Sequence, residues 1–252
     1  MKKLVVLAGL LQIFAVCTTQ AVMQVVLYQN LTNYSHGNAG EFNALPNAAL
    51  LSVNPTLTGY APTTADLTAV NPYFQTFCVE EGEFFSPGST YNVTISTEVL
   101  YNGGQFPAGE PITLGTAWLY SRFADGTLSG YDYTYGSDRI TSAGDLQQAL
   151  WYLQGEVTSL VSGGADGTAF YNAAVFALGG TVTNAANGAY GVVALNLWVP
   201  GPNGSNGAAA QDQLMVIPGP TTVPEPTTTG FACLLLLLPG IRKTRALFRK
   251  RA

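Results

Sequence analysis

Alternating apolar and polar residues predict strands near both ends of the chain and helices between them. Residues 90–100 alternate with β-branched residues and are expected to be a strand, and 22–28 and 41–45, separated by an Asn-rich turn, are also expected to be strands. Three central segments carry apolar residues at helical spacing: 111–123, 142–156 and 167–180. Two late segments again resemble strands and flank a Gly- and Asn-rich loop: 191–200 and 211–219. This order predicts an α+β, β-rich single domain, an antiparallel sheet or sandwich with two or three helices.

Residues 142–156 have the clearest helical pattern. Four apolar residues form the stripe expected of a buried helix face: Leu146, Ala149, Leu150 and Leu153. Ser142 and Asp145 resemble a capping box, which predicts that the helix begins at Ser142. The proline-rich stretch 46–72 has no periodicity and is expected to be a loop.

Both ends of the chain predict export. Residues 1–21 have two lysines, an apolar core and a small-residue end, the layout of a secretory signal peptide. Near the other end, 230–241 is an apolar run shorter than the roughly 20 residues that span a bilayer. A basic cluster follows it, as expected of a short hydrophobic helix held at least transiently at a membrane with its end in the cytoplasm.

Charge and residue inventory exclude several functions for the part between these ends. Residues 22–222 hold fourteen acidic residues but only two basic ones, Arg122 and Arg139, so nucleic acid is not an expected partner. His36 is the single histidine, and no G-x-S-x-G motif occurs, so neither an enzyme nor a cofactor is expected. Three aspartates could offer oxygen ligands to calcium, at a spacing that matches no calcium loop: Asp125, Asp132 and Asp138.

The C-terminal motif resembles a known sorting signal. Val223, Pro224, Glu225 and Pro226 precede the apolar run, and Arg242, Lys243 and Arg245 flank its far side. This order is similar to the PEP-CTERM signal of exported proteins in Gram-negative bacteria that make extracellular polysaccharide. The resemblance implies an exosortase that cuts near the motif, then release of an inner-membrane-tethered precursor to the outer surface or extracellular matrix. It divides the chain into a signal peptide (1–21), a body (22–217) and a sorting signal (218–252).

The stretch YFQTFCVEEGEFF, residues 73–85, places one cysteine in the body, on a predicted strand. Cys78 is open to three interpretations: a buried small hydrophobe, one half of an intermolecular disulfide, or a reactive group. The segments TFCVE and LQQALWYLQGE resemble the Cys and Gln segments of bacterial thioester domains, with Leu150 in place of Ile. The resemblance implies an internal thioester between Cys78 and Gln147, with Gln148 as a rival, and the Cys78 sulfur in contact with the Gln147 side chain.

The chemistry of such a bond sets further expectations. A thiolate attacks the glutamine carbonyl and releases ammonia, and the acyl group survives where aromatic residues exclude water. Proton transfer could be assisted by three carboxylates if burial raises their pKa values: Glu80, Glu81 and Glu83. The sequence therefore predicts a structural or adhesive surface protein that attaches once to an amine or hydroxyl partner. The alternative is a noncovalent exopolysaccharide- or matrix-binding module, with sugar-stacking tyrosines in 131–135; a secreted hydrolase lacks any recognisable nucleophile.

Overall fold

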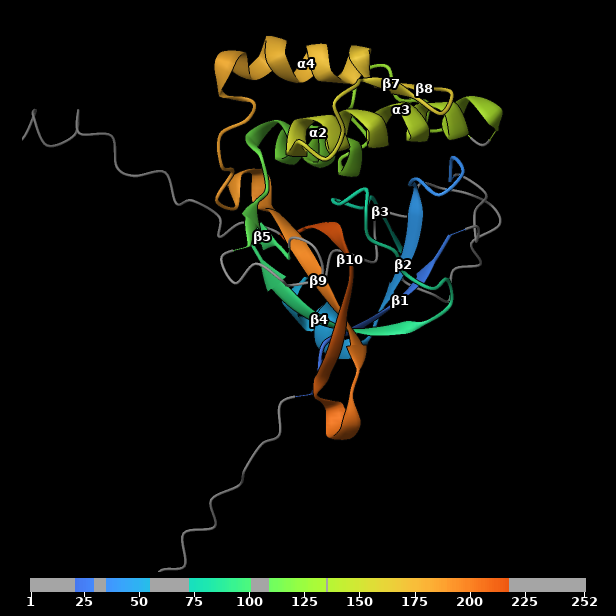
Figure 1. Ribbon diagram of the computed structural model, residues 1–252, viewed down its shortest axis with the longest axis vertical. Coiled ribbons are helices and arrows are strands. Elements are labelled where there is room, and N and C mark those ends of the chain that lie inside the picture. Colours follow the sequence, from blue (N-terminus) through green and yellow to red (C-terminus); the bar gives the residue numbers. More distant parts are fainter. Residues whose placement is uncertain (1–20, 30–34, 55–72, 101–108, 135, 218–252) are drawn as a thin grey trace, which may run out of the picture. The chain divides into compact units, whose positions relative to one another are not determined.

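Six strands of the body pair in antiparallel fashion and form one curled sheet (Figure 1). The computed structural model describes residues 21–29, 35–54, 73–100, 109–134 and 136–217. The strands, in their order across the sheet, are β10 (Asn206–Val216), β9 (Val192–Pro200), β4 (Thr90–Ser96), β1 (Gln24–Tyr28), β2 (Phe42–Pro46) and β3 (Phe74–Thr76). Two short hairpins accompany them: β5 (Glu98–Val99) with β6 (Glu110–Pro111), and β7 (Val161–Ser162) with β8 (Ala165–Asp166).

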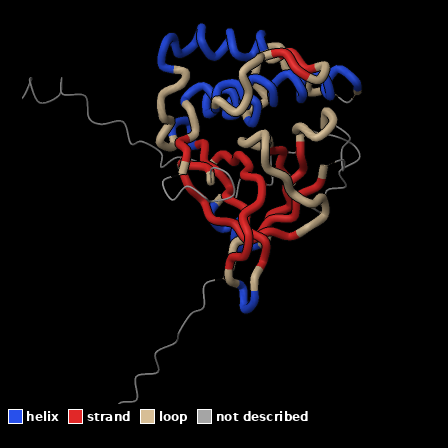
Figure 2. The backbone as a smooth tube through the Cα atoms, in the orientation of Figure 1, coloured by secondary structure: helices blue, strands red, loops and turns tan. Residues whose placement is uncertain are grey.

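Three of the α-helices gather at one end of this sheet (Figure 2). The helices are α1 (Ala48–Val53), α2 (Leu114–Ala124), α3 (Ser137–Gln154) and α4 (Thr168–Leu178). The Thr113 hydroxyl accepts the Thr116 N–H and so caps the start of α2, and α3 ends at Gly155 in the left-handed conformation. The helices α2, α3 and α4 contact one another, and α2 also packs on β9 and β10.

The curl brings the two edges of the sheet, β3 and β10, close together. The Thr76 hydroxyl donates to the Leu214 carbonyl at 2.7 Å, and the Leu214 N–H donates to the Phe77 carbonyl at 3.1 Å. One residue further, Cys78 forms a single antiparallel bridge with Gln213. Cys78 is therefore fixed where the chain leaves β3 and crosses to β10.

Apolar side chains form one cluster on each face of the sheet. Along β9, Val192 and Ala194 face the cluster under the helices, whereas Val193 and Leu195 face the cluster enclosed by the curl. The predicted stripe of α3 lies entirely in the helix-side cluster. Burying one leucine contributes about 1.5–3 kcal/mol, against about 0.5–1.5 kcal/mol net for a hydrogen bond. Apolar packing therefore sets the position of α3 on the sheet.

The predicted α+β class is confirmed, with one curled six-stranded sheet, two short hairpins and four α-helices in the described residues. The predicted loop 46–72 is wrong at its start, because the Asn47 side chain caps α1 by accepting the Leu50 N–H. The predicted start at Ser142 is also wrong. Helix α3 begins at Ser137, where Asp138 supplies the acidic residue favoured in a first turn, and the Ser142 hydroxyl instead accepts the Asp132 N–H.

The predicted signal peptide (but for its last residue) and sorting signal, residues 1–20 and 218–252, lie outside the described residues. Val223, Pro224, Glu225 and Pro226 and the flanking basic residues are among them. Within the described ranges, every helix is too short or too polar to cross a bilayer.

Candidate functional site

Cys78 and Gln147 are in contact although 69 positions separate them in the chain. The Cys78 Sγ lies 3.2 Å from the Gln147 Oε1. The same oxygen accepts hydrogen bonds from the backbone N–H groups of Cys78 and Gly40, each at 3.2 Å. The Gln147 Nε2 donates to the Cys78 carbonyl at 2.8 Å. Because backbone N–H groups can only donate, these bonds fix which end of the carboxamide is the oxygen.

Both residues are fully buried, at 0% exposure. Gln147 lies within α3, next to the leucine stripe that packs against the sheet. Gln148, the rival glutamine, has its side chain bound elsewhere, since its Nε2 donates to the Ser159 carbonyl at 2.6 Å. The geometry thus brings Gln147, and not Gln148, to the cysteine.

Burial keeps the cysteine protonated. It raises the pKa of the Cys78 thiol well above its usual value, and the carboxylates of Glu80 and Glu156 raise it further. The Cys78 backbone N–H and the Trp151 indole N–H act in the opposite direction, because donors favour the thiolate. At neutral pH the sulfur is a neutral thiol in contact with a fully oriented carboxamide, so its proton must leave during any attack on the carbonyl.

Of the three predicted carboxylates, Glu80 is the one that is buried, at 2% exposure. Burial raises its pKa, and the neighbouring carboxyl groups of Asp212 and Glu83 raise it further. Burial also raises the pKa of Asp212 to about 8. Glu81 is exposed, contrary to the idea that burial tunes it, and its backbone N–H donates to Glu156 Oε2 at 3.2 Å. Two residues after Cys78, therefore, the chain enters an acidic cluster made by Glu80, Glu83 and Asp212.

A buried ion pair that sequence reasoning missed adjoins the site. Arg139 of α3 pairs with Glu41, the residue after Gly40, and the two are 0% and 1% exposed. The Arg139 Nε donates to Glu41 Oε2 at 3.0 Å, and the Tyr131 hydroxyl donates to the same oxygen at 2.6 Å. The sequence did contain a signal, because Arg139 is one of only two cations in the acidic body. A lone cation there needs a partner if it is buried.

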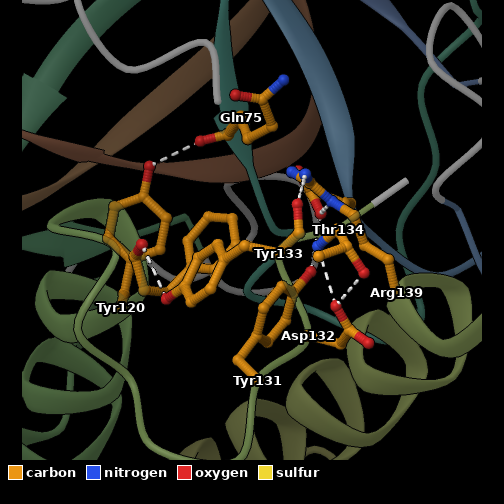
Figure 3. A network of polar contacts seen from close by, with 9 residues as sticks. Gln75, Tyr120, Tyr131, Asp132, Tyr133, Thr134 and Arg139 are labelled. Carbon is orange, nitrogen blue, oxygen red and sulfur yellow. Dashed lines mark hydrogen bonds and ion pairs between the residues drawn. The ribbon is translucent and has the colours of Figure 1, made fainter. Parts of the chain in front are cut away.

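Tyr131 and Tyr133, the described tyrosines of the segment 131–135, do not form the expected sugar-stacking surface. Tyr131 is buried and Tyr133 is half-buried, and their rings lie 5.0 and 6.0 Å from the ring of Phe123. Figure 3 shows both rings inside the polar network that contains Arg139. These rings turn inward because their hydroxyls find partners there, Glu41 for Tyr131 and the Phe123 carbonyl for Tyr133. Tyr135 lies outside the described residues.

No metal centre is formed by the part of the chain that the structure describes. The Asp132 carboxylate accepts the N–H and the hydroxyl of Thr134, which holds its pKa below the usual value. The single histidine, His36, packs against α3, and its ring occupies the space that a Cβ at position 144 would need.

A separate pocket of about 380 Å³ lies at the C-terminal end of α3, and its lining includes Glu110 and Tyr152.

Three comparisons of the chain with known proteins found no match. No protein-family model, curated protein or solved structure matches the chain. What the site does must therefore be argued from its own geometry.

Proposed function

We propose that the chain is an exported surface or matrix protein whose body closes an internal thioester between Cys78 and Gln147. The bond would be used once, to attach the protein covalently to an amine or hydroxyl group of a partner. A reaction that consumes its own acyl group has no turnover, so the role is adhesive or structural. The single observation that carries the proposal is the 3.2 Å contact between Cys78 Sγ and Gln147 Oε1 inside a closed site.

The arrangement favours bond formation over simple packing. A buried cysteine usually serves as a small hydrophobe among apolar neighbours. Here it meets a carboxamide whose oxygen and nitrogen are both held by backbone groups. Formation joins Sγ to the side-chain carbonyl carbon of Gln147 and breaks the bond to Nε2, and the thiol proton leaves with the nitrogen as ammonia. The full burial of both residues would protect the product from hydrolysis.

The composition of the body supports attachment to another molecule. Residues 22–222 contain no lysine, so no lysine side chain of the body competes for the acyl group. Trp151 and Glu156, which both act on the Cys78 thiol, are partly exposed. We expect the partner nucleophile to approach past these two residues, because both are partly exposed and both act on the thiol.

Export and sorting complete the proposed role. The PEP-CTERM-like residues 223–226 would direct the precursor to an exosortase at the inner membrane of a Gram-negative bacterium. Cutting near this motif would release the body to the outer surface or to the exopolysaccharide matrix. Both destinations supply amine and hydroxyl groups.

The test is the intact mass of the purified full chain. An internal thioester makes the mass lower by one ammonia, and treatment with methylamine adds one methylamine, so that the product is one methylene heavier than the sequence and has one thiol freed. The Cys78→Ala and Gln147→Ala variants should show neither change, although Cys17 and Cys233 remain. A wild-type chain at its full sequence mass would reject the thioester.

One observation favours a second candidate, a noncovalent matrix-binding module. The pocket at the end of α3 combines an aromatic ring, Tyr152, with polar groups such as Glu110 and Thr113, the combination that sugars bind. Retention of the Cys78→Ala variant on the producer's exopolysaccharide, abolished by Tyr152→Ala, would support this function. Loss of retention in Cys78→Ala itself would favour covalent attachment instead.

A further inference from the structure

Residues 36–41 contact α3 at three points. The His36 ring occupies the space beside Gly144, where a Cβ would lie only 2.7 Å from the ring atoms. The Gly40 N–H donates to Gln147, and Glu41 pairs with Arg139. Gly40 is 107 positions away from Gln147 in the chain. The contacts of His36 before it and of Glu41 after it hold the segment against the same helix.

Two backbone donors point at the oxygen on which charge would develop. The N–H groups of Gly40 and Cys78 both lie 3.2 Å from Gln147 Oε1, in a site without exposed surface. When sulfur attacks the carbonyl carbon, an electron pair moves onto this oxygen and returns as the leaving group departs. Fixed donors in a water-excluded site stabilise such a charge far more than they stabilise the neutral carbonyl.

The absence of a side chain at Gly40 is required by this arrangement. A Cβ at Gly40 would lie 2.5 Å from Phe77 Cδ1 and 3.1 Å from Gln147 Oε1. The first distance is far inside contact range and the second is tight. Any other residue would therefore push the Gly40 N–H away from the carboxamide.

The ion pair next to Gly40 holds that donor in place. Arg139 grips both oxygens of Glu41 with Nε and Nη2, and its Nη1 donates to the Tyr133 carbonyl at 2.8 Å. Tyr131 adds a third donor to the Glu41 carboxylate. Figure 3 shows Tyr131, Tyr133 and Arg139 meeting in this network. Because the planar guanidinium is held at several points, Glu41 has little freedom to move. Gly40 is the preceding residue in the chain, so its N–H group is held in place as well.

We infer that the backbone N–H groups of Gly40 and Cys78 form an oxyanion hole for acyl transfer between Gln147 and Cys78, with Glu41, Arg139 and Tyr131 as positioning residues. This inference rests on the proposed thioester. The same hole serves the later attack by an amine, in which a nitrogen–carbon bond forms, the carbon–sulfur bond breaks and the amine proton returns to the thiol. Acyl transfer in both directions depends on the Gly40 donor.

The direct test removes one backbone N–H group and leaves every side chain in place. Glycolic acid incorporated at position 40 of the full chain replaces the Gly40 N–H by an ester oxygen. Removing one such donor is expected to slow methylamine opening of the thioester by roughly 10²–10³-fold. The infrared carbonyl band of ¹³C-labelled Gln147 should also move to higher frequency, because one hydrogen bond to the thioester carbonyl is lost. Glycolic acid at Gly37, an exposed glycine of the same segment, is the matched control and should change neither quantity.

A second variant tests the positioning residues without leaving a buried charge unpaired. Replacing a buried ion pair by apolar residues of similar size is often neutral for stability. The Glu41→Leu/Arg139→Met double variant should therefore keep its urea midpoint while thioester formation or methylamine opening slows at least about tenfold. Tyr131→Phe, which keeps the ion pair, should show a smaller slowing and a smaller infrared shift.

The outcomes separate the oxyanion hole from the function itself. Suppose that the wild-type chain has the thioester, and that the glycolic acid variant at position 40 opens with methylamine at the wild-type rate and shows an unchanged infrared carbonyl band. This result overturns the oxyanion hole and leaves the proposed function intact. An unmoved rate in a folded double variant overturns the positioning role. A wild-type chain without ammonia loss overturns both the hole and the thioester.

Discussion

Two buried polar clusters adjoin the Cys78–Gln147 contact, and they handle charge in opposite ways. Glu41, next to Gly40, is paired with Arg139 and receives a further hydrogen bond from Tyr131. Glu80, two residues after Cys78, accepts the Asp212 backbone N–H and lies beside two other acids, Glu83 and Asp212, and no cation pairs with it among the described residues. Glu41 and Arg139 in the first cluster and Glu80 and Asp212 in the second are all at most 2% exposed, so the difference lies in partners and not in depth.

This difference in partners means that the Glu41–Arg139 cluster has a fixed geometry, whereas the Glu80–Glu83–Asp212 cluster holds protons. An ionised pair held by a guanidinium fork has one geometry, which suits a cluster that must aim a backbone donor. Acids without a cation escape the desolvation penalty by keeping their protons, so the charge of this cluster depends on pH. The paired cluster should therefore respond to loss of a partner, and the acidic cluster to pH.

The largest effect should follow from removing one member of the ion pair. Arg139→Met leaves the Glu41 carboxylate buried without its cation, which is expected to lower the free energy of unfolding by about 3–5 kcal/mol. Adding Glu41→Leu should recover most of this loss. Urea unfolding with an unchanged slope measures both values.

The other arginine of the body supplies the control. Arg122 is exposed and lies over the Trp118 ring, 5.8 Å from its centroid. Arg122→Met should lower stability by no more than about 1 kcal/mol. Equal losses in the Arg122 and Arg139 variants would contradict the idea that the Glu41–Arg139 pair is a buried, mutually dependent unit.

The acidic cluster should make stability fall as pH rises. Asp212 has its folded-state pKa raised to about 8, so between about pH 4 and pH 8 the folded state binds a proton that the unfolded state has lost. The free energy of unfolding then falls by up to about 1.4 kcal/mol per pH unit across this window. Glu80, whose pKa is also raised, extends the decline to higher pH.

Denaturation curves recorded between pH 5 and pH 9 test this prediction. Asp212→Asn should flatten the decline, because the group that binds the extra proton is gone. Glu98→Gln, a change at an exposed carboxylate outside the cluster, should leave the slope as it is. A wild-type stability that rises with pH over this range would show that the acids are ionised in the folded state.

The features of the fold and of the site also differ in how well the sequence predicted them. The leucine stripe of α3 could be predicted, because helical spacing records which face is buried. Glu80 was a candidate from its distance of two residues from Cys78, although only the fold brings Asp212 to it. Gly40 carried no local signal, since its role depends on a contact made across 107 positions. The start of α3 was misread because a capping-box pattern at Ser142 is equally compatible with a helix that has already begun.

The smallest expected effect concerns the ionisation of the Cys78 thiol, which lies next to both clusters. Trp151, one turn after Gln147, presents a buried indole N–H that lowers the pKa of Cys78, while Glu80 and Glu156 raise it. Trp151→Phe removes this donor and should slow ammonia release at a fixed pH. The slowing should stay below about tenfold, because a regular hydrogen bond to a charged group contributes about 1.5–3 kcal/mol and the Trp151 indole nitrogen makes no regular hydrogen bond in the structure.

Opening the thioester with ammonia restores the Gln147 carboxamide and the Cys78 thiol. Refolding of this chain from urea starts the reaction, and intact mass follows it from pH 7 to pH 9. The rate should rise with pH throughout in wild type, since the thiol pKa lies above this range, and the variant should need a higher pH to reach the same rate. Trp118→Phe, a change in the indole beside Arg122, is the control and should leave the profile in place. If the Trp151 variant had the wild-type profile, the indole would have no part in thiol ionisation.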